Sequence, residues 1–176
     1  MMLYTHLAAA SGEATIDRTR RERLAEAYGT YAADAVRLAF LLTGDADLAR
    51  DLVQDAFVRV ASHLPRIKEP EKFRSYLRKT VANLAKNHYR RRALERRHLQ
   101  SATAPSAQPG PEGRDEIFDD LLRLPLRQRT AIVLRYYVDL PEREAADEMG
   151  CSVAAVKALS ARGIRQLRQW AEEEER

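Results

Sequence analysis

The stretch EREAADEMGCSVAAVKALSARGIRQLRQW, residues 142–170, decides the fold of the second half of the chain. Apolar and small residues recur at helical spacing on both sides of a Gly-Cys-Ser corner, which predicts two helices joined by a tight turn. Gly150 can take the left-handed conformation that this corner needs, and Ser152 can cap the helix that follows. Ala146 permits a close helix crossing, while Val156 fills the space between the helices. The stretch therefore predicts a helix-turn-helix.

The second helix of this stretch has an outer face of small and basic residues. Val153, Val156 and Leu159 are expected to turn inward. Small side chains let a helix enter the major groove of DNA, and flanking cations contact phosphates. The residues expected to face DNA are Ser152, Ala154, Ala155, Lys157, Ala158, Arg162 and Arg165. A helical hairpin with a merely solvated basic face is the alternative.

The whole chain shows helical periodicity and no alternating strand pattern, which predicts an all-α protein of two small helical domains. The first domain is expected over residues 21–98 and the second over residues 115–171. Residues 99–114 are rich in Pro, Gly and small polar residues, which predicts a flexible linker. Residues 1–20 are expected to form a flexible amino-terminal extension and residues 172–176 an acidic tail.

Three helices are expected in the first domain, over about residues 21–42, 46–63 and 70–98. Asp45 is a plausible N-cap for the second of them, because its carboxylate can accept hydrogen bonds from the first free amides. Pro70 suits the first turn of the third helix, where no amide donor is needed.

The composition excludes several classes of protein. One cysteine in 176 residues rules out an internal disulfide framework and a cysteine-based zinc site, and the four histidines have no metal-ligand spacing. A Gly-rich phosphate loop and a strand-based nucleophile elbow are both missing, so neither an enzyme nor a cofactor is expected. The sequence contains no apolar run of membrane-spanning length, and a cytoplasmic protein without membrane insertion is expected.

Charge is segregated along the first domain, which favours different partners for different faces. Residues 51–57, DLVQDAF, are acidic, whereas the third expected helix is dense in Lys and Arg. That helix also carries Phe73 and Tyr76, and rings among cations are typical of single-stranded DNA binding. Packing in the core is the alternative for both rings.

Three segments, in this order, resemble the extracytoplasmic-function sigma factors, the small promoter-specificity subunits of bacterial RNA polymerase. The segments are DLVQDAFVRV at residues 51–60, FRSYLRKTVANLAKNHYRRR at residues 73–92, and the run from LPLRQRT to GIRQLR at residues 124–168. The resemblance covers roughly residues 28–97 and 117–170. It implies that the first domain is sigma region 2 and the second is sigma region 4.

The resemblance also implies partners and roles: a chain that binds core RNA polymerase and promoter DNA, supports DNA melting and initiates transcription. It implies that the clamp helices of the largest polymerase subunit are contacted by Asp51, Leu52, Gln54, Asp55 and Phe57. It also implies that the minus-ten element and the adjoining duplex are bound by His63, Arg66, Lys68, Phe73, Arg74, Tyr76, Asn83, Lys86, Asn87, Arg90 and Arg91. The helix over residues 152–165 would bind the minus-thirty-five element. The polymerase flap and an anti-sigma factor are further partners that the family allows.

The chain departs from the family in two places. Relatives commonly carry a Trp near Tyr76 and a Val-Lys-Ser-Arg run where this chain has Val156 to Leu159, so no particular minus-thirty-five sequence is carried over. Two other interpretations stay open. One is a self-sufficient helix-turn-helix regulator, which would need a dimer interface. The other is a protein-interaction module that sequesters a regulator.

Overall fold

A computed structural model describes residues 3–63, 69–98 and 116–174. Within these ranges all regular structure is helical, which confirms the all-α prediction. The helices are α1 (Leu3–Thr43), α2 (Ala46–Ala61), α3 (Pro70–His98), α4 (Glu116–Arg123), α5 (Leu126–Ile132), the π-helix η2 (Val133–Tyr137), α6 (Glu142–Met149) and α7 (Val153–Glu174). The expected linker over residues 99–114 lies outside the described residues.

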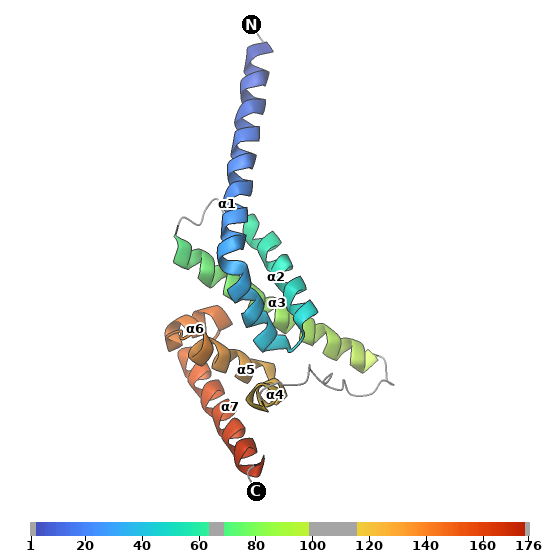
Figure 1. Ribbon diagram of the computed structural model, residues 1–176, viewed down its shortest axis with the longest axis vertical. Helices are drawn as coiled ribbons and strands as arrows, with labels where there is room; N and C mark the ends of the chain where they lie inside the picture. Colours follow the sequence, from blue (N-terminus) through green and yellow to red (C-terminus); the bar gives the residue numbers. More distant parts are fainter. Residues whose placement is uncertain (1–2, 64–68, 99–115, 175–176) are drawn as a thin grey trace.

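The helices form two groups (Figure 1). Helices α1 to α3 make the amino-terminal bundle, and the helices from α4 to α7 make the carboxyl-terminal bundle. In the first, the fully buried alanines Ala39, Ala49 and Ala56 let α1 and α2 approach closely. Larger apolar side chains, among them Leu38, Leu42 and Val53, fill the remaining interior.

Helix α1 is longer than the sequence pattern predicts. It begins at Leu3 and projects well beyond the bundle (Figure 1), whereas a flexible extension was expected over residues 1–20. Once the packed part of α1 is formed, each further residue adds a hydrogen bond without a new nucleation cost, and the helix contains no proline to stop it. Helix α7 likewise continues to Glu174, through most of the expected acidic tail.

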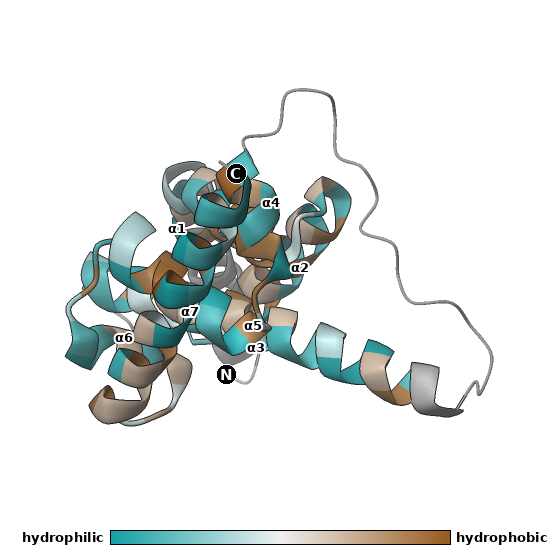
Figure 2. Cartoon of the chain, turned by 90° about the horizontal axis from the view of Figure 1, so that it is seen from below, coloured by the Kyte–Doolittle hydropathy of each residue, from teal (hydrophilic) through white to brown (hydrophobic). Residues whose placement is uncertain are grey.

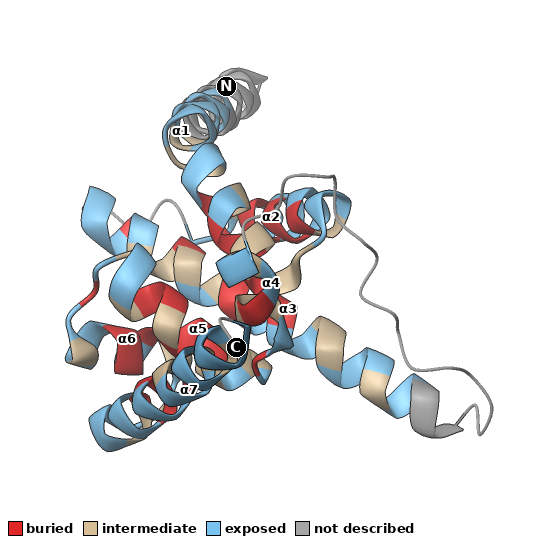
Figure 3. Cartoon of the chain, turned by 60° about the horizontal axis from the view of Figure 1, so that its bottom comes forward, coloured by how far each residue is buried: buried red, intermediate tan, exposed pale blue. Residues whose placement is uncertain are grey.

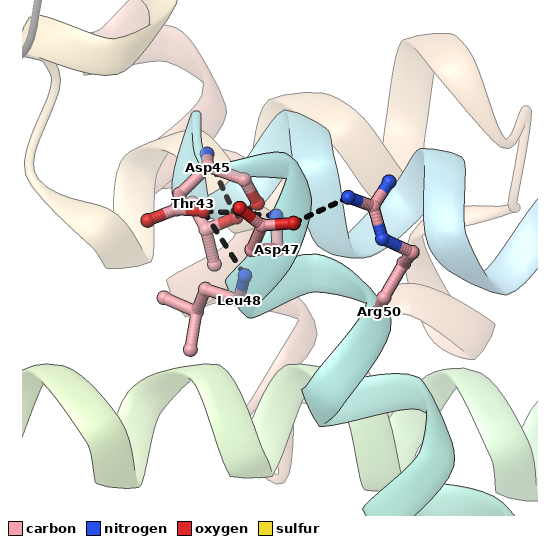
Figure 4. A network of polar contacts seen from close by, with 5 residues as sticks. All are labelled: Thr43, Asp45, Asp47, Leu48 and Arg50. Atoms are coloured by element: carbon pink, nitrogen blue, oxygen red, sulfur yellow. Dashed lines mark hydrogen bonds and ion pairs between the residues drawn. The ribbon is translucent and has the colours of Figure 1, made fainter.

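The start of α2 is fixed by a polar network in the short turn after α1 (Figure 4). The Asp45 carboxylate accepts hydrogen bonds from the amides of Asp47 and Leu48, both at 3.0 Å, so the N-cap prediction is confirmed. Asp47 lies in the first turn, where a negative charge favours the helix dipole, and it also pairs with Arg50. This network sets the register of α2 and hence the residues it exposes.

The helix-turn-helix prediction is confirmed, except that Val153, which was expected to turn inward, is 38% exposed at the start of α7. Gly150 adopts the left-handed conformation (φ 61°, ψ 46°) at the end of α6. The Ser152 hydroxyl accepts a hydrogen bond from the Ala155 amide at 3.2 Å, which caps α7. Val156 is fully buried and Ala146 nearly so, as the corner requires.

A glycine brings α7 against α5. A Cβ atom built on Gly163 would lie only 2.6 Å from the Ile132 Cδ1 atom and 3.5 Å from the Gln128 Cβ atom. The missing side chain therefore lets the two helices cross closely, and this contact fixes the orientation of α7 in its bundle.

The two bundles are not separate in the structure, which the sequence did not predict. Helix α3 packs against α6, and α1 packs against α4 and α5. The buried cluster runs continuously from Leu77 and Val81 to Leu134, Ala145 and Ala146, so the buried segments of both bundles meet at the centre (Figure 3). The far end of α3 projects away from both bundles and is largely hydrophilic (Figure 2).

A pair of glycine substitutions tests the turn at which the bundles meet. Gly44 has φ +72°, and a Cβ atom there would lie 2.5 Å from the Leu122 Cδ1 atom of α4. Gly44→Ala should lower the free energy of unfolding by about 1–3 kcal/mol, because an L-residue is strained at this φ. Urea denaturation followed by circular dichroism measures the change.

Gly29→Ala is the matched control. Gly29 lies in the exposed part of α1, and a Cβ atom there would meet nothing within 4 Å. Alanine should stabilise the helix by roughly 0.5–1 kcal/mol relative to glycine. If both substitutions shift stability in the same direction, the strain assigned to Gly44 is wrong.

Candidate nucleic-acid and partner interfaces

Helix α2 exposes an acidic face. Asp51, Gln54 and Asp55 are all exposed, and their spacing of three and four residues places them side by side on the helix. Leu52 and Phe57 were expected to share this face, but they are only 6% and 4% exposed. That assignment is corrected: both side chains pack inward and hold α2 in place, because their apolar surface is better buried than solvated.

The aromatic side chains at the start of α3 have different environments. Phe73 is 4% exposed, and its ring centroid lies 5.3 Å from that of Tyr31 and 6.2 Å from that of Phe57. Phe73 is therefore part of the core and does not offer its ring to a base, which corrects the prediction. Tyr76 is half-buried, with its ring 5.2 Å from the exposed His63 ring, so these two rings remain candidates for base contact.

The middle of α3 carries an exposed polar and basic stripe. Asn83, Lys86, Asn87 and Arg90 follow helical spacing, and each is exposed, as is Arg91. We call these five residues the α3 stripe. Because all five side chains are exposed, the stripe is accessible to a long polyanion.

Two other side chains of α3 contribute less free positive charge than the sequence suggests. Burial, followed by the positive charges of Arg92 and Arg91, lowers the pKa of His88, so its imidazole is neutral at neutral pH and adds no cation. Arg74, predicted to contact DNA, is exposed but has the Asp34 carboxylate 3.6 Å away. Arg66 and Lys68, the other cations predicted here, lie outside the described residues.

The outer face of α7 presents the predicted residues, with one exception. The exposed members, which we call the α7 face, are Ser152, Ala154, Lys157, Ala158, Arg162 and Arg165. Ala155 is half-buried, and its amide takes part in the helix cap. Lys157 pairs with Glu142 of α6 at 3.2 Å, so Arg162 and Arg165 are its more available cations.

Sequence periodicity missed two arginines that lie next to this face. Arg135 of η2 and Arg168 of α7 line a cavity of about 320 Å³ together with Lys157 and Arg165. Arg168 follows Arg165 at helical spacing and could have been found from α7, whereas Arg135 belongs to another helix and lines the cavity only in the folded chain. The Arg135 guanidinium also donates to the Leu140 carbonyl, which holds it in place.

Across residues 3–63, 69–98 and 116–174, no group of three His, Cys, Asp or Glu side chains is arranged to hold a metal ion. None of the described helices combines the length and apolar character needed to cross a bilayer.

Each of the two bundles matches a model of a known protein family. Residues 27–95 match the family model described as Sigma-70 region 2, and residues 115–167 match that described as Sigma-70, region 4. Together the two matched segments cover more than half of the chain. They correspond to the amino-terminal and carboxyl-terminal bundles.

Individual proteins are similar over most of the chain. The sequence is 28% identical to the RNA polymerase sigma factor SigV of Bacillus subtilis (strain 168), over 77% of this chain and 82% of that protein. It is 29% identical to the ECF RNA polymerase sigma factor EcfG of Rhodopseudomonas palustris (strain TIE-1), over 68% of this chain and 69% of that protein.

Solved structures share the fold. The sigma factor RpoE of Bartonella quintana, solved in complex with the anti-sigma factor NepR, has a TM-score of 0.70 at 20% identity, over 86% of this chain and 98% of that one. CnrH, solved in complex with the cytosolic domain of CnrY, has a TM-score of 0.63 at 23% identity, over 87% of this chain and 90% of that one.

Proposed function

The chain belongs to the extracytoplasmic-function group of the sigma-70 family, and from this we propose how its exposed surfaces serve transcription initiation. As an RNA polymerase sigma factor, it directs the polymerase to promoters. The proposal rests on one observation: three chemically different surfaces lie on three different helices. These are an acidic face on α2, a basic stripe on α3 and a face of small and basic residues on α7.

The energetics of melting require a larger partner. Opening about a dozen base pairs costs on the order of 15 kcal/mol, at roughly 1.4 kcal/mol per step. A single small module binds DNA without sequence preference only at about 0.1 mM to 1 μM. Modules mounted together on core polymerase act at high effective concentration, so individually weak contacts add up. The chain is then a regulatory subunit, and the catalytic chemistry belongs to the polymerase.

The acidic face of α2 is the surface proposed for core polymerase. Asp51 and Asp55 would meet basic side chains of the clamp helices, and Gln54 between them can donate and accept hydrogen bonds. Helix α2 suits this role because its backbone is held by the Asp45 cap and by its buried side, so docking orders few additional groups. The flap is proposed as a second contact, made by the carboxyl-terminal bundle.

The two basic surfaces are proposed for DNA. The α3 stripe would hold duplex phosphates upstream of the minus-ten element, while Tyr76 and His63 would stack on a base of the opened strand. The α7 face would enter the major groove at the minus-thirty-five element, since Ala154 and Ala158 allow close approach and Arg162 and Arg165 reach phosphates.

Two further aspects follow from the relatives. The Bartonella quintana sigma factor was solved with an anti-sigma factor, which supports the proposal that this chain has such a partner. Because bacterial core polymerase works in the cytoplasm, a cytoplasmic location is proposed for this chain as well.

Transcription from purified components tests the function. The chain, core polymerase and a library of genomic fragments should give transcripts from a few discrete start sites that share elements near minus ten and minus thirty-five. Core polymerase alone should give none of these transcripts. A self-sufficient regulator would instead dimerise and bind DNA without polymerase, and sedimentation of the chain with and without core distinguishes the two. Absence of any chain-dependent start site would contradict the proposal.

A further inference from the structure

The cavity beside the α7 face has the size of a small-ligand site. Its volume of about 320 Å³ lies at the lower end of the range of roughly 300–1,000 Å³ that is usual for such sites. The lining comes from three helices, with Arg135 and Tyr136 on η2, Glu142 on α6 and the remaining residues on α7. Its shape therefore depends on how η2 and α6 pack beside α7.

A buried hydroxyl in the wall of this cavity has no partner. Ser160 is only 6% exposed, and its Oγ atom makes no hydrogen bond with any of the described residues. A hydroxyl inside a helix often donates to the carbonyl four residues earlier, as that of Thr130 does to Leu126 at 2.8 Å. A buried polar atom without a partner is costly, so a native protein usually has a reason for one. Because Ser160 lines the cavity, an acceptor on a bound ligand would satisfy it.

The wall of the cavity is strongly cationic. The side chains that carry this charge are Arg135, Lys157, Arg165 and Arg168. The one carboxylate in the lining, that of Glu142, lies 3.2 Å from the Lys157 ammonium, which compensates its charge. Within the described ranges, Lys157 is the only one of these cations that is paired with a carboxylate. Guanidinium groups bind phosphate oxygens through paired hydrogen bonds, so the three arginines favour a ligand that carries phosphate.

The same cavity offers an aromatic ring. Tyr136 is 60% exposed, and the Arg135 Cζ atom lies 5.9 Å from its ring centroid. The Arg135 guanidinium also donates to the Leu140 carbonyl, which holds this cation beside the ring. Val156 and Ile164 add apolar surface to the lining. A ring next to a guanidinium is a stacking platform for a nucleobase, since every base has a π-face and arginine adds a cation–π contribution.

The depth of Ser160 favours a small ligand over the DNA backbone. The phosphates of a duplex lie on the outside of a wide cylinder, so they can reach the exposed Arg165 and Arg168 side chains. They cannot follow the wall of a recessed cavity to a buried hydroxyl. The phosphate group of a small soluble molecule has no such restriction.

We propose that this cavity is a binding site for a nucleoside polyphosphate. The base stacks on Tyr136, the phosphates lie between Arg165 and Arg168, and a phosphate oxygen accepts a hydrogen bond from the Ser160 hydroxyl. Lys157 and Arg165 belong to both the cavity and the α7 face. A bound nucleotide therefore competes with DNA for these two cations. This competition rests on the proposed function, whereas nucleotide binding itself does not.

Nucleotide titration tests the site without DNA or polymerase. The anisotropy of a ribose-labelled fluorescent ATP analogue, titrated with the full chain, gives the affinity. Unlabelled ATP, GTP, adenosine and tripolyphosphate then serve as competitors. ATP and GTP should compete at least about 10-fold better than adenosine, which lacks the phosphates, and than tripolyphosphate, which lacks the ring. Adenosine or tripolyphosphate competing as well as ATP would overturn the proposal.

Two substitutions in the cavity separate binding from a structural role. Ser160→Ala and Arg168→Gln should each weaken nucleotide binding by about 10-fold or more, because each removes a hydrogen bond to a charged group. If the Ser160 hydroxyl were only structural, its removal would change thermal stability and leave the affinity for nucleotide as it was. Arg168 is exposed, so its variant should fold normally. Unchanged nucleotide affinity in both variants would overturn the proposal.

Arg162→Gln is the matched control for Arg168→Gln. It removes an exposed arginine from the same helix, but Arg162 does not line the cavity, so nucleotide binding should be unchanged. Equal losses in the two variants would mean that the basic helix attracts anions in general, and would overturn the site.

Duplex binding distinguishes a soluble ligand from the DNA backbone as the source of the phosphate. Ser160→Ala should leave the affinity for a labelled duplex unchanged, whereas Arg162→Gln should lower it. ATP at about ten times its dissociation constant should weaken duplex binding by the wild-type chain about 10-fold, by mass action, and should do so less in Ser160→Ala. Loss of duplex binding without loss of nucleotide binding in Ser160→Ala would assign the hydroxyl to DNA and overturn the proposal.

The same measurements separate this proposal from the function. Nucleotide binding without competition against the duplex supports the site and overturns its link to DNA. Failure of the chain to direct transcription contradicts the proposed function, while the titrations without DNA still decide whether the cavity binds nucleotide.

Discussion

Core RNA polymerase should bind the double variant Asp51→Lys, Asp55→Lys at least about 100-fold more weakly than the wild-type chain, a loss of about 3 kcal/mol. Both carboxylates are exposed and lie four residues apart on α2, so they present their charges to the same partner surface. Charge reversal replaces two attractions by two repulsions, and like charges across an interface cost several kcal/mol. Titration of fluorescent chain with core polymerase measures the change.

The variant should fold normally, because the inward side of α2 is left intact. Leu52 and Phe57 remain buried, and the Asp45 cap is one turn or more away. The matched control is Glu172→Lys with Glu174→Lys, which makes the same change in net charge at exposed positions of α7. If the α2 variant binds core as tightly as this control does, α2 is not the docking surface.

Local sequence chemistry was sufficient to predict the helix-turn-helix corner and the caps of α2 and α7, although not the full length of α1. Gly150, Ser152 and Val156 each have a conformational or packing requirement that depends on neighbours within a few positions, and all three behave as expected. The Asp45 cap was predictable for the same reason. Such features can be recognised without knowing what packs against the helix.

Burial on α3 could not be predicted in this way. Phe73 and Tyr76 are three residues apart, so helical spacing places both on one side of the helix. Phe73 is covered by Tyr31 of α1 and by Phe57 of α2, while Tyr76 lies next to His63 at the margin. The neighbours that separate a core ring from a candidate base-stacking ring come from distant parts of the chain.

Contacts between the bundles were equally beyond local patterns. Arg78 lies in a helix dense in cations, and Glu148 lies in a short amphipathic helix with other carboxylates. Nothing in their immediate surroundings marks them as partners, because pairing over 70 positions depends on how α3 and α6 are packed. Arg135 could not be predicted for the same reason, because it lines the cavity beside α7 only in the folded chain.

The second large effect is expected on DNA binding by the α7 face. Arg162→Gln with Arg165→Gln should reduce the slope of log K against log salt by about 1.8, because each lost phosphate contact accounts for about 0.9. Affinity for any duplex should fall with it, by about 10- to 100-fold at low salt, since non-specific binding is mainly electrostatic. Fluorescence anisotropy with a labelled duplex at several salt concentrations gives both quantities.

Two comparisons make the result specific to the proposed geometry. Arg127→Gln removes an exposed arginine from α5, outside the α7 face, and should leave the slope unchanged. Ala158→Gln adds no charge but places a longer side chain where close approach is needed, so it should weaken binding without changing the slope. Because the α7 face is exposed in the structure, these differences should appear without polymerase. An unchanged slope in the Arg162, Arg165 variant would mean that α7 meets DNA through another face or not at all.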